Sequence, residues 1–342
     1  MRKTLLIILC FTCLIAKAQD PQFSQYYNAP LLLNPAMAGA TDCYRAGLNS
    51  RVQWAGLVGS FRTHAAFADL NVPDMRSGFG LSVLYDDIGV AGLSSSDISG
   101  YYSYLVPVTD QFNLRFGLQA SYVSRNINYG SLLFEDQFYG TVPVQGFTID
   151  EVAMHNRVNY MDISSGIFMY GEDTWWFGMA VHHLSRPQQE FFLRDSRLPV
   201  RLSVHGGYNF YVKQYHHQPA EEALRVVPTF LYKRQAGFQQ VDFGVYTIKA
   251  PIMLGLWYRG VFVEQHEEIY QSDAIIAQAG FRYKDFAFTY SYDFTISKLQ
   301  HRNTHGSHEV SIIYLFCLDW PPRKKTSRRV KRLPCPDFQR GR

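Results

Sequence analysis

Apolar and polar residues alternate along most of this 342-residue chain. The alternation is clearest from Phe112 to Tyr122, from Val200 to Val212 and from Phe286 to Phe294. A period of two predicts β-strands with one apolar and one polar face. Strands of soluble sandwiches are typically about 5–6 residues long, whereas strands that cross a membrane need about 9–11 residues. Because the runs here reach ten residues or more, they favour a membrane-spanning barrel.

The alternation predicts fourteen strands, an even number that suits a closed antiparallel barrel of bacterial type. The predicted strands are 43–54, 61–72, 78–88, 95–106, 111–124, 157–170, 174–184, 200–212, 224–235, 238–248, 251–260, 273–283, 285–296 and 307–317. We therefore predict an all-β protein, a transmembrane antiparallel β-barrel of about 14 strands over residues 43–317.

The predicted connections alternate between short and long, as the periplasmic turns and outer loops of such barrels do. Tight turns are expected at 107–110 and 171–173, and the longest loop at 125–156. Two connections break the pattern, because 236–237 is short where a loop is expected and 213–223 is longer than a turn.

The polar faces of the strands predict a lumen filled by water or by a plug. The residues expected to face inward include Arg115, Gln119, Arg201, His205, Asn209, Arg282 and Asp293. Aromatic residues near the strand ends are expected to form girdles at the membrane interfaces. These are Trp54, Tyr101, Tyr102, Trp175, Trp176, Trp257 and Tyr258.

Charge is scarce and unevenly distributed. Only 18% of the residues are charged, against about 25% in an average chain, which fits a wall that faces lipid. The net charge of +4 is a sum of +3 for residues 1–18, −7 for 19–320 and +8 for 321–342. The basic residues of the tail are Arg323, Lys324, Lys325, Arg328, Arg329, Lys331, Arg332, Arg340 and Arg342.

The first 18 residues have the pattern of a secretory signal peptide. Arg2 and Lys3 precede the apolar run Leu5–Ile15, which ends in Ala16-Lys17-Ala18. This run is shorter than the ~20 residues that span a bilayer. We expect cleavage after Ala18 and export to the outer membrane, with a mature N-terminal segment at 19–42 and a basic periplasmic tail at 318–342.

Catalytic motifs are missing: the chain has no G-x-S-x-G, P-loop, H-E-x-x-H or G-x-G-x-x-G pattern. We expect no enzymatic activity, no cofactor and no metal. His301, His305 and His308 lie close together and suggest either a metal site or, as we favour, a polar surface loop. The pairs His182-His183 and His216-His217 are expected to point to opposite faces of a strand, so neither forms a site on its own.

Three cysteines, Cys43, Cys317 and Cys335, remain after signal removal. Export permits a disulfide. A Cys317–Cys335 or Cys43–Cys335 bond would tie the tail to the barrel rim, and three unpaired thiols are the alternative. The odd count leaves at least one cysteine without a partner in the monomer.

The mature N-terminus is rich in proline, glutamine and asparagine, so it suits neither a strand nor a long helix. Its apolar residues favour an ordered segment in the periplasmic mouth or the lumen over a free linker.

The run D-P-Q-F-S-Q-Y-Y at Asp20–Tyr27, followed by N-P-A-x-A-G at Asn34–Gly39, resembles the PorP/SprF family of outer-membrane proteins of Bacteroidetes. The ending Arg332–Phe338 is similar to that of the PorP-type members, although four residues follow Phe338.

The resemblance implies a non-enzymatic component of type IX protein secretion, the apparatus linked to gliding motility. Its expected partners are periplasmic ring proteins or a secreted adhesin, together with outer-membrane lipid, and not nucleic acid. The residues expected to bind a partner are Gln22, Phe23, Ser24, Gln25, Tyr26, Asn34, Pro35, Arg323, Lys324, Lys325, Arg328, Arg329, Lys331 and Arg332. An outer-membrane channel or hydrophobic-solute transporter is the alternative function.

Overall fold

The structure is a computed structural model of the chain. It describes residues 20–41, 43–57, 59–89, 92–109, 112–128, 138–139, 142–143, 156–171, 174–189, 197–213, 223–263, 269–298 and 301–316. The predicted signal peptide and the basic tail therefore lie outside the described residues.

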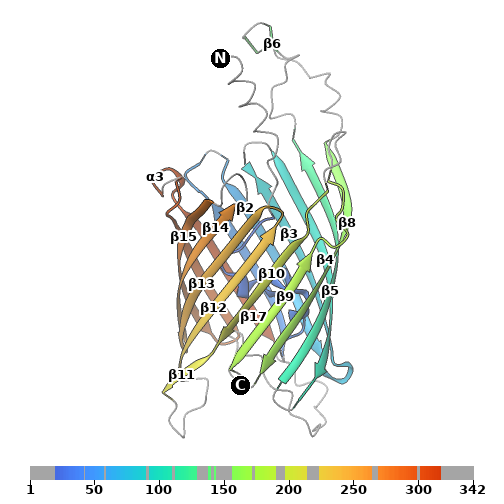
Figure 1. Cartoon of the computed structure of the whole chain (residues 1–342), viewed down its shortest axis with the longest axis vertical. Coiled ribbons are helices and arrows are strands. Elements are labelled where there is room, and N and C mark those ends of the chain that lie inside the picture. The colour runs from blue at the N-terminus through green and yellow to red at the C-terminus, as the bar shows by residue number, and fades with distance from the viewer. Residues whose placement is uncertain are drawn as a thin grey trace.

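The described strands form one closed antiparallel barrel (Figure 1). Its wall consists of β1 (Tyr44–Gln53), β2 (Phe61–Val72), β3 (Ser77–Ile88), β4 (Leu93–Pro107), β5 (Phe112–Ile127), β8 (Arg157–Gly171), β9 (Trp175–His182), β10 (Arg201–Tyr208) with β11 (Phe210–Lys213), β12 (Leu224–Gln235), β13 (Phe238–Lys249), β14 (Ile252–Val263), β15 (Ile269–Tyr283), β16 (Phe286–Thr295) and β17 (Ser307–Phe316). Each strand pairs with its neighbours in the chain, and β1 pairs with β17 to close the wall. β10 and β11 both pair with β12 and are interrupted only at Asn209, so they make one wall strand. The predicted fourteen-stranded barrel is confirmed.

Several strands extend beyond the apolar alternation that predicted them. β4 and β5 stay paired up to Leu93 and Ile127, and β14 and β15 up to Val263 and Ile269. Backbone hydrogen bonding continues there beyond the regular alternation, because strand pairing needs no lipid-facing side chain. Within the predicted loop 125–156, β6 (Phe138–Tyr139) and β7 (Val142–Pro143) form a small hairpin.

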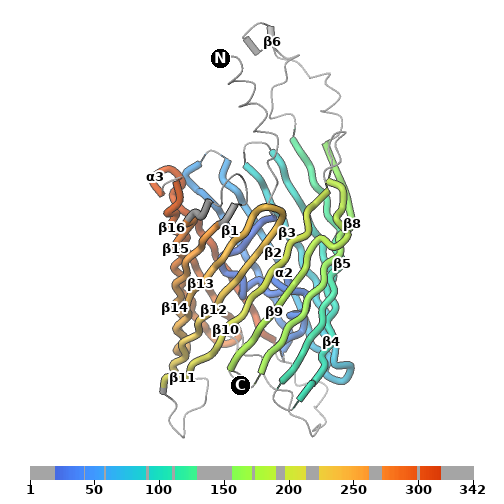
Figure 2. Tube along the Cα trace, viewed as in Figure 1, coloured from blue at the N-terminus to red at the C-terminus, as the bar shows by residue number. Residues whose placement is uncertain are grey.

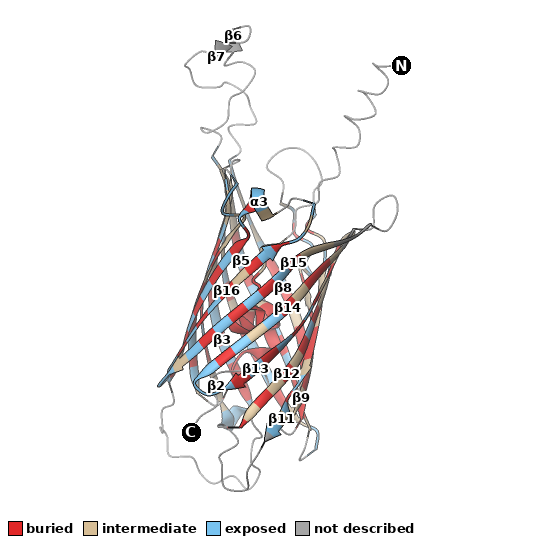
Figure 3. Ribbon diagram, turned by 90° about the vertical axis from the view of Figure 1, so that its left-hand side faces the viewer, coloured by how far each residue is buried: buried red, intermediate tan, exposed pale blue. Residues whose placement is uncertain are grey.

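The two faces of the wall differ as the alternation predicts (Figure 3). Leu81, Leu118 and Phe243 point outward and keep 66%, 56% and 62% of their surface exposed. Arg115 and Asp242 point inward and are buried. A continuous apolar outer surface of this kind is stable only against lipid. Among the described helices, none is both long and apolar enough to cross a membrane.

The connections distinguish the two ends of the barrel. One end has short turns, such as Ala250–Pro251 and Lys284–Asp285, and includes the 3-10 turn η4 (Pro73–Met75). The other end has the long 128–156 connection and α3 (His301–Thr304). By the rule that periplasmic turns are short, we call these ends the periplasmic and the outer end. The exceptional connections at 236–237 and 214–223 lie where the sequence placed them.

Residues 20–41, which we call the plug, lie inside the barrel (Figure 2). The plug consists of three short helical turns, η2 (Tyr26–Asn28), α2 (Pro30–Leu33) and η3 (Pro35–Met37). Pro30 and Pro35 begin two of these turns, since proline lacks only an N–H that has no intrahelical acceptor at that position. The prolines that argued against a strand thus set the path of the plug.

Candidate functional site in the barrel lumen

The tip of the plug is held at the outer end by an ionic clasp around Asp20. Asp20 Oδ2 accepts hydrogen bonds from Arg201 Nη1 and His183 Nε2, both at 2.7 Å. His183 Nδ1 contacts Asp162 Oδ2 at 2.8 Å, so this imidazole bridges two carboxylates. His183 comes one residue after β9 and Arg201 begins β10. The clasp therefore joins the plug tip to three neighbouring strands of the wall.

The charges of the clasp favour the ionised forms of both Asp20 and His183. Burial alone would raise the pKa of Asp20, but the neighbouring Arg201 and His183 hold it well below its usual range. Burial likewise opposes the charged form of His183, but the Asp20 and Asp162 carboxylates outweigh it and raise the pKa of His183 to about 9. At neutral pH, His183 is accordingly an imidazolium held between two carboxylates.

Deeper in the lumen, Ser24 and Gln25 bind a buried network of charged wall residues. The Ser24 hydroxyl donates to Asp293 Oδ2 at 2.6 Å and accepts from Arg51 Nη1 at 2.6 Å and Arg259 Nη2 at 2.9 Å. The backbone N–H groups of Ser24 and Gln25 donate to the two carboxylate oxygens of Glu309, at 2.7 and 3.0 Å. Breaking such buried ion pairs leaves an uncompensated charge, so this network fixes the plug strongly.

Aromatic residues of the plug and the wall pack beside this network. Trp176 Nε1 donates to the hydroxyl of Tyr27 at 2.9 Å, and the two rings meet edge to face. Trp257 Nε1 donates to Thr229 Oγ1, which also contacts the Tyr26 hydroxyl. These indole groups combine a large apolar contact with a satisfied N–H.

The predicted aromatic girdle is therefore wrong for three residues. Tyr101, Trp176 and Trp257 are buried and face the lumen. Adjacent strand residues point to opposite faces, so in a pair such as Tyr101-Tyr102 only one ring can reach lipid. Tyr102 is the outward member of that pair and is 41% exposed.

Asn34, Pro35 and Ala36 dock on wall glycines of three adjacent strands. The Asn34 side chain accepts from Ala36 N–H at 2.9 Å and donates to the backbone oxygen of Ile167 at 3.0 Å. A Cβ at Gly117 would lie 2.1 Å from Ala36 N, and one at Gly166 would lie 2.0 Å from Asn34 Oδ1. A Cβ at Gly178 would likewise lie 2.9 Å from Asn34 Nδ2. The glycine at 117 lets the plug backbone come this close to the wall, and the glycines at 166 and 178 leave room for the Asn34 side chain.

The periplasmic end of the plug is fastened by Gly39. This residue has φ +58°, and a Cβ there would lie 2.4 Å from the backbone oxygen of Leu70, so only glycine fits without strain. Its N–H donates to Asp69 Oδ2 at 2.7 Å, and Asp69 forms an ion pair with Arg45 at 2.8 Å. The Gly39 carbonyl accepts from Arg115. The plug thus extends from this point to the clasp at the outer end.

The N-terminal residues predicted to bind a partner all lie in the plug. Of these, Phe23, Ser24, Gln25, Tyr26, Asn34 and Pro35 are buried, while Gln22 is half-buried near the outer end. Their observed contacts are with the barrel wall, and their binding to a partner stays a prediction. The seven basic tail residues proposed as partner contacts, from Arg323 to Arg332, lie outside the described residues.

Sequence reasoning missed the clasp, and it was wrong about His182 and His183. His183 has φ +60° just after the end of β9, which turns its side chain into the lumen beside buried His182. The two rings are 6.3 Å apart. The alternation rule fails there because it holds only within a strand. In the sequence, Asp20 stood out only as the first residue of the motif Asp20–Tyr27. His216 and His217 lie outside the described residues.

The three histidines near the outer end each contact an aromatic ring or its hydroxyl. His301 stacks on Phe294 with ring centroids 4.1 Å apart, and His308 Nδ1 lies 2.8 Å from the Tyr290 hydroxyl. Within the part of the chain that the structure describes, no group of three or more His, Cys, Asp or Glu side chains is arranged to hold a metal.

Cys43 is disulfide-bonded. The chain's other cysteines, Cys10, Cys13, Cys317 and Cys335, all lie outside the described residues. The Cys317–Cys335 prediction therefore also lies there. Three unpaired thiols, the alternative considered from the sequence, are excluded by the bond at Cys43.

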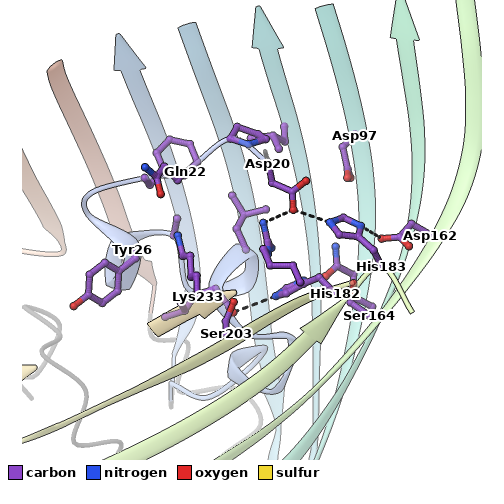
Figure 4. A pocket seen from close by; sticks show the side chains of 18 residues that line it. Asp20, Gln22, Tyr26, Asp97, Asp162, Ser164, His182, His183, Ser203 and Lys233 are labelled. Atoms are coloured by element: carbon purple, nitrogen blue, oxygen red, sulfur yellow. Dashed lines mark hydrogen bonds and ion pairs between the residues drawn. The ribbon is translucent and has the colours of Figure 1, made fainter. Parts of the chain in front are cut away.

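A cavity of about 100 Å³ lies between the plug tip and the wall (Figure 4). Phe23, Leu32 and Leu33 of the plug line its apolar side. Polar and charged residues line most of the rest, among them the clasp residues together with Asp97 and Lys233. The cavity is thus amphipathic and is built jointly by the plug and the wall.

The sequence of the chain matches the family model described as "Type IX secretion system membrane protein PorP/SprF" over residues 15–314. The chain belongs to the PorP/SprF family. This match covers the plug and nearly the whole barrel, so the resemblance found in Asp20–Tyr27 and Asn34–Gly39 is confirmed at the level of the family. No curated protein matches the chain.

Solved structures that resemble this PorP/SprF member include three proteins of low sequence identity. A FadL homologue of Pseudomonas aeruginosa is 15% identical, with 84% of this chain and 94% of that chain covered and a TM-score of 0.46. The toluene transporter TodX of P. putida is 10% identical, with coverages of 85% and 94% and a TM-score of 0.49. The toluene transporter TbuX of Ralstonia pickettii is 12% identical, with the same coverages and a TM-score of 0.44.

Proposed function

We propose that this PorP/SprF member is a non-enzymatic outer-membrane platform of type IX secretion that docks periplasmic ring proteins or a secreted adhesin. The observation that carries the proposal is the plug. Residues 23–31 and 33–39 are all buried inside the barrel. They are bound by ion pairs, by hydrogen bonds and by the packing of Asn34, Pro35 and Ala36 on wall glycines, which we call the glycine seat. A lumen occupied by a segment of the chain itself supports the role of an anchoring platform rather than that of an open pore.

The basic tail is the docking element that we propose. Residues 321–342 contain nine basic residues and one acid, for a net charge of +8, while residues 19–320 carry −7. β17 ends at the periplasmic end, so the tail that follows it would begin in the periplasm. A tail of this charge attracts an acidic partner surface, and the association rate falls as salt rises. Anionic lipid and peptidoglycan are the competing ligands.

Removal of residues 321–342 tests this docking. We expect the truncated barrel to assemble normally but to lose both its co-purifying partners and the secretion of type IX cargo. A matched control replaces Lys324, Lys325 and Lys331 by arginine, which keeps the charge and should keep secretion. Normal secretion by the truncated protein would refute tail docking without affecting the barrel assignment.

An outer-membrane channel or hydrophobic-solute transporter is the alternative, and the cavity at the outer end is the observation that favours it. Planar-bilayer recording on the purified barrel separates the two functions. A plugged platform should show no large steady single-channel current, and large steady currents would favour the channel.

A further inference from the structure

Two charged side chains that line the cavity of Figure 4 form no ion pair with any described residue. Lys233 points into the lumen from β12 and forms no ion pair or hydrogen bond with any described residue. Asp97 points inward from β4; among the described residues, its carboxylate accepts a hydrogen bond only from the Ser99 hydroxyl and forms no ion pair. Both side chains are half-buried.

The other charges that line the cavity neutralise one another. Asp20 is paired with Arg201 and His183, and Asp162 with His183. What remains for a ligand is the amino group of Lys233 and the carboxylate of Asp97, at separate places on the lining. Figure 4 shows Lys233 and Asp97 on opposite sides of Asp20. A partly desolvated charge without a partner is costly, so a ligand that supplies both missing counter-charges gains from both.

The remaining lining selects the body of such a ligand. Phe23, Leu32 and Leu33 of the plug and Leu84 of β3 form an apolar side. The cavity of about 100 Å³ has room for several waters, since one water needs roughly 10–15 Å³, which suits an amino acid or a very short peptide. Asp20, Pro21 and Gln22 are half-buried, so solvent reaches the cavity from the outer end.

We infer that the cavity between the plug tip and the wall binds a small zwitterion of the amino-acid type, either a free apolar amino acid or a dipeptide with free ends. The ligand carboxylate pairs with Lys233, the ligand ammonium with Asp97, and the apolar side chain packs on Phe23 and Leu33. The ligand thereby contacts plug and wall together and stabilises the plug in its seat.

Isothermal titration of the full-length protein in detergent tests this inference. The ligands are leucine, dileucine, leucinamide, which lacks the carboxylate, and N-acetyl-leucine, which lacks the ammonium. We expect the two capped compounds, leucinamide and N-acetyl-leucine, to bind at least tenfold more weakly than leucine. Whichever of leucine and dileucine binds more tightly shows whether the ligand is a free amino acid or a short peptide. No heat from leucine and dileucine, or equal affinity for a capped and an uncapped compound, would overturn the inference.

Two variants assign the charges. In Lys233→Met, leucine and leucinamide should bind equally, and in Asp97→Asn, leucine and N-acetyl-leucine should do so. A variant that merely unfolds cannot produce such an exchange of selectivity. The controls are Lys249→Met and Asp74→Asn, at exposed positions of β13 and η4. Selectivity in Lys233→Met and Asp97→Asn identical to that of the controls would contradict the assignment. Secretion of type IX cargo is a separate measurement, so failure of this inference and failure of tail docking are distinguishable.

Discussion

Gly117 provides the sharpest test of how the plug is seated. In Gly117→Ala, the new Cβ would lie 2.1 Å from Ala36 N and 2.3 Å from the carbonyl carbon of Pro35. Both are backbone atoms, which cannot rotate away as a flexible side chain does. An ordinary van der Waals contact starts at 3.4 Å, so the seat must move by about 1.3 Å.

The cost of this shift follows from the contacts at Asn34. Overpacking a well-filled site costs about 1–3 kcal/mol. A movement of that size also lengthens the 3.0 Å hydrogen bond from Asn34 Nδ2 to the Ile167 oxygen beyond bonding distance, a loss of about 0.5–1.5 kcal/mol. The sum of roughly 2–4 kcal/mol lowers the seated fraction of the plug relative to the unseated one by at least tenfold.

The matched control is Gly100→Ala on β4. Gly100 faces outward, and a Cβ there would have no atom within 4 Å. Hydrogen exchange of the backbone amides of residues 31–34 and 36–37 measures the seating, and heat-dependent gel migration checks that the barrel is folded. We expect faster exchange and intermittent currents in Gly117→Ala only. Equal exchange protection in the two alanine variants would refute the glycine-seat argument.

Three further predictions concern the clasp, the buried network and the disulfide. Protonated His183 contributes its full stabilisation of the clasp at pH values below about 6.5, the pKa of this histidine in the unfolded chain. The contribution is lost as pH rises through about 9, the pKa of His183 in the folded protein. The Asp20 contribution is lost only as pH falls below about 4. Exchange protection of residues 22–24 should therefore fall between pH 6.5 and 9.5, and a slope unchanged in His183→Gln would contradict this. Arg51→Met should destabilise the protein by about 3–5 kcal/mol in thermal unfolding, because Asp293 and Glu309 lose a buried cation; Arg62→Met, at an exposed outward position of β2, should change stability by no more than about 0.5 kcal/mol. β1 pairs Tyr44 with Phe316, so one further step along both strands predicts a bond from Cys43 to Cys317, which non-reducing peptide mapping would detect; a Cys43–Cys335 peptide would instead show that the tail is tied to the rim.

The wall of the barrel was predictable because its signal is local. Lipid requires an apolar outer face, so every second residue from Phe112 to Tyr122 is apolar, and the period can be counted in one segment. The inward direction of Arg115, His205 and Asp293 follows from the same count. The strand ends were less predictable, since β5 continues to Ile127 by backbone pairing alone.

The sequence by itself determined that the chain is a barrel of fourteen strands, that residues 20–41 contain the family motif, and that the charges are divided between an acidic body and a basic tail. Only the tertiary structure decided what the motif contacts. Ser24 meets Arg51, Arg259 and Asp293 across 27, 235 and 269 positions of the chain, and Asn34 meets glycine-lined strands more than 130 positions away. Closure of the barrel brings these residues together, and no periodicity along the chain records which positions a closed sheet places opposite one another.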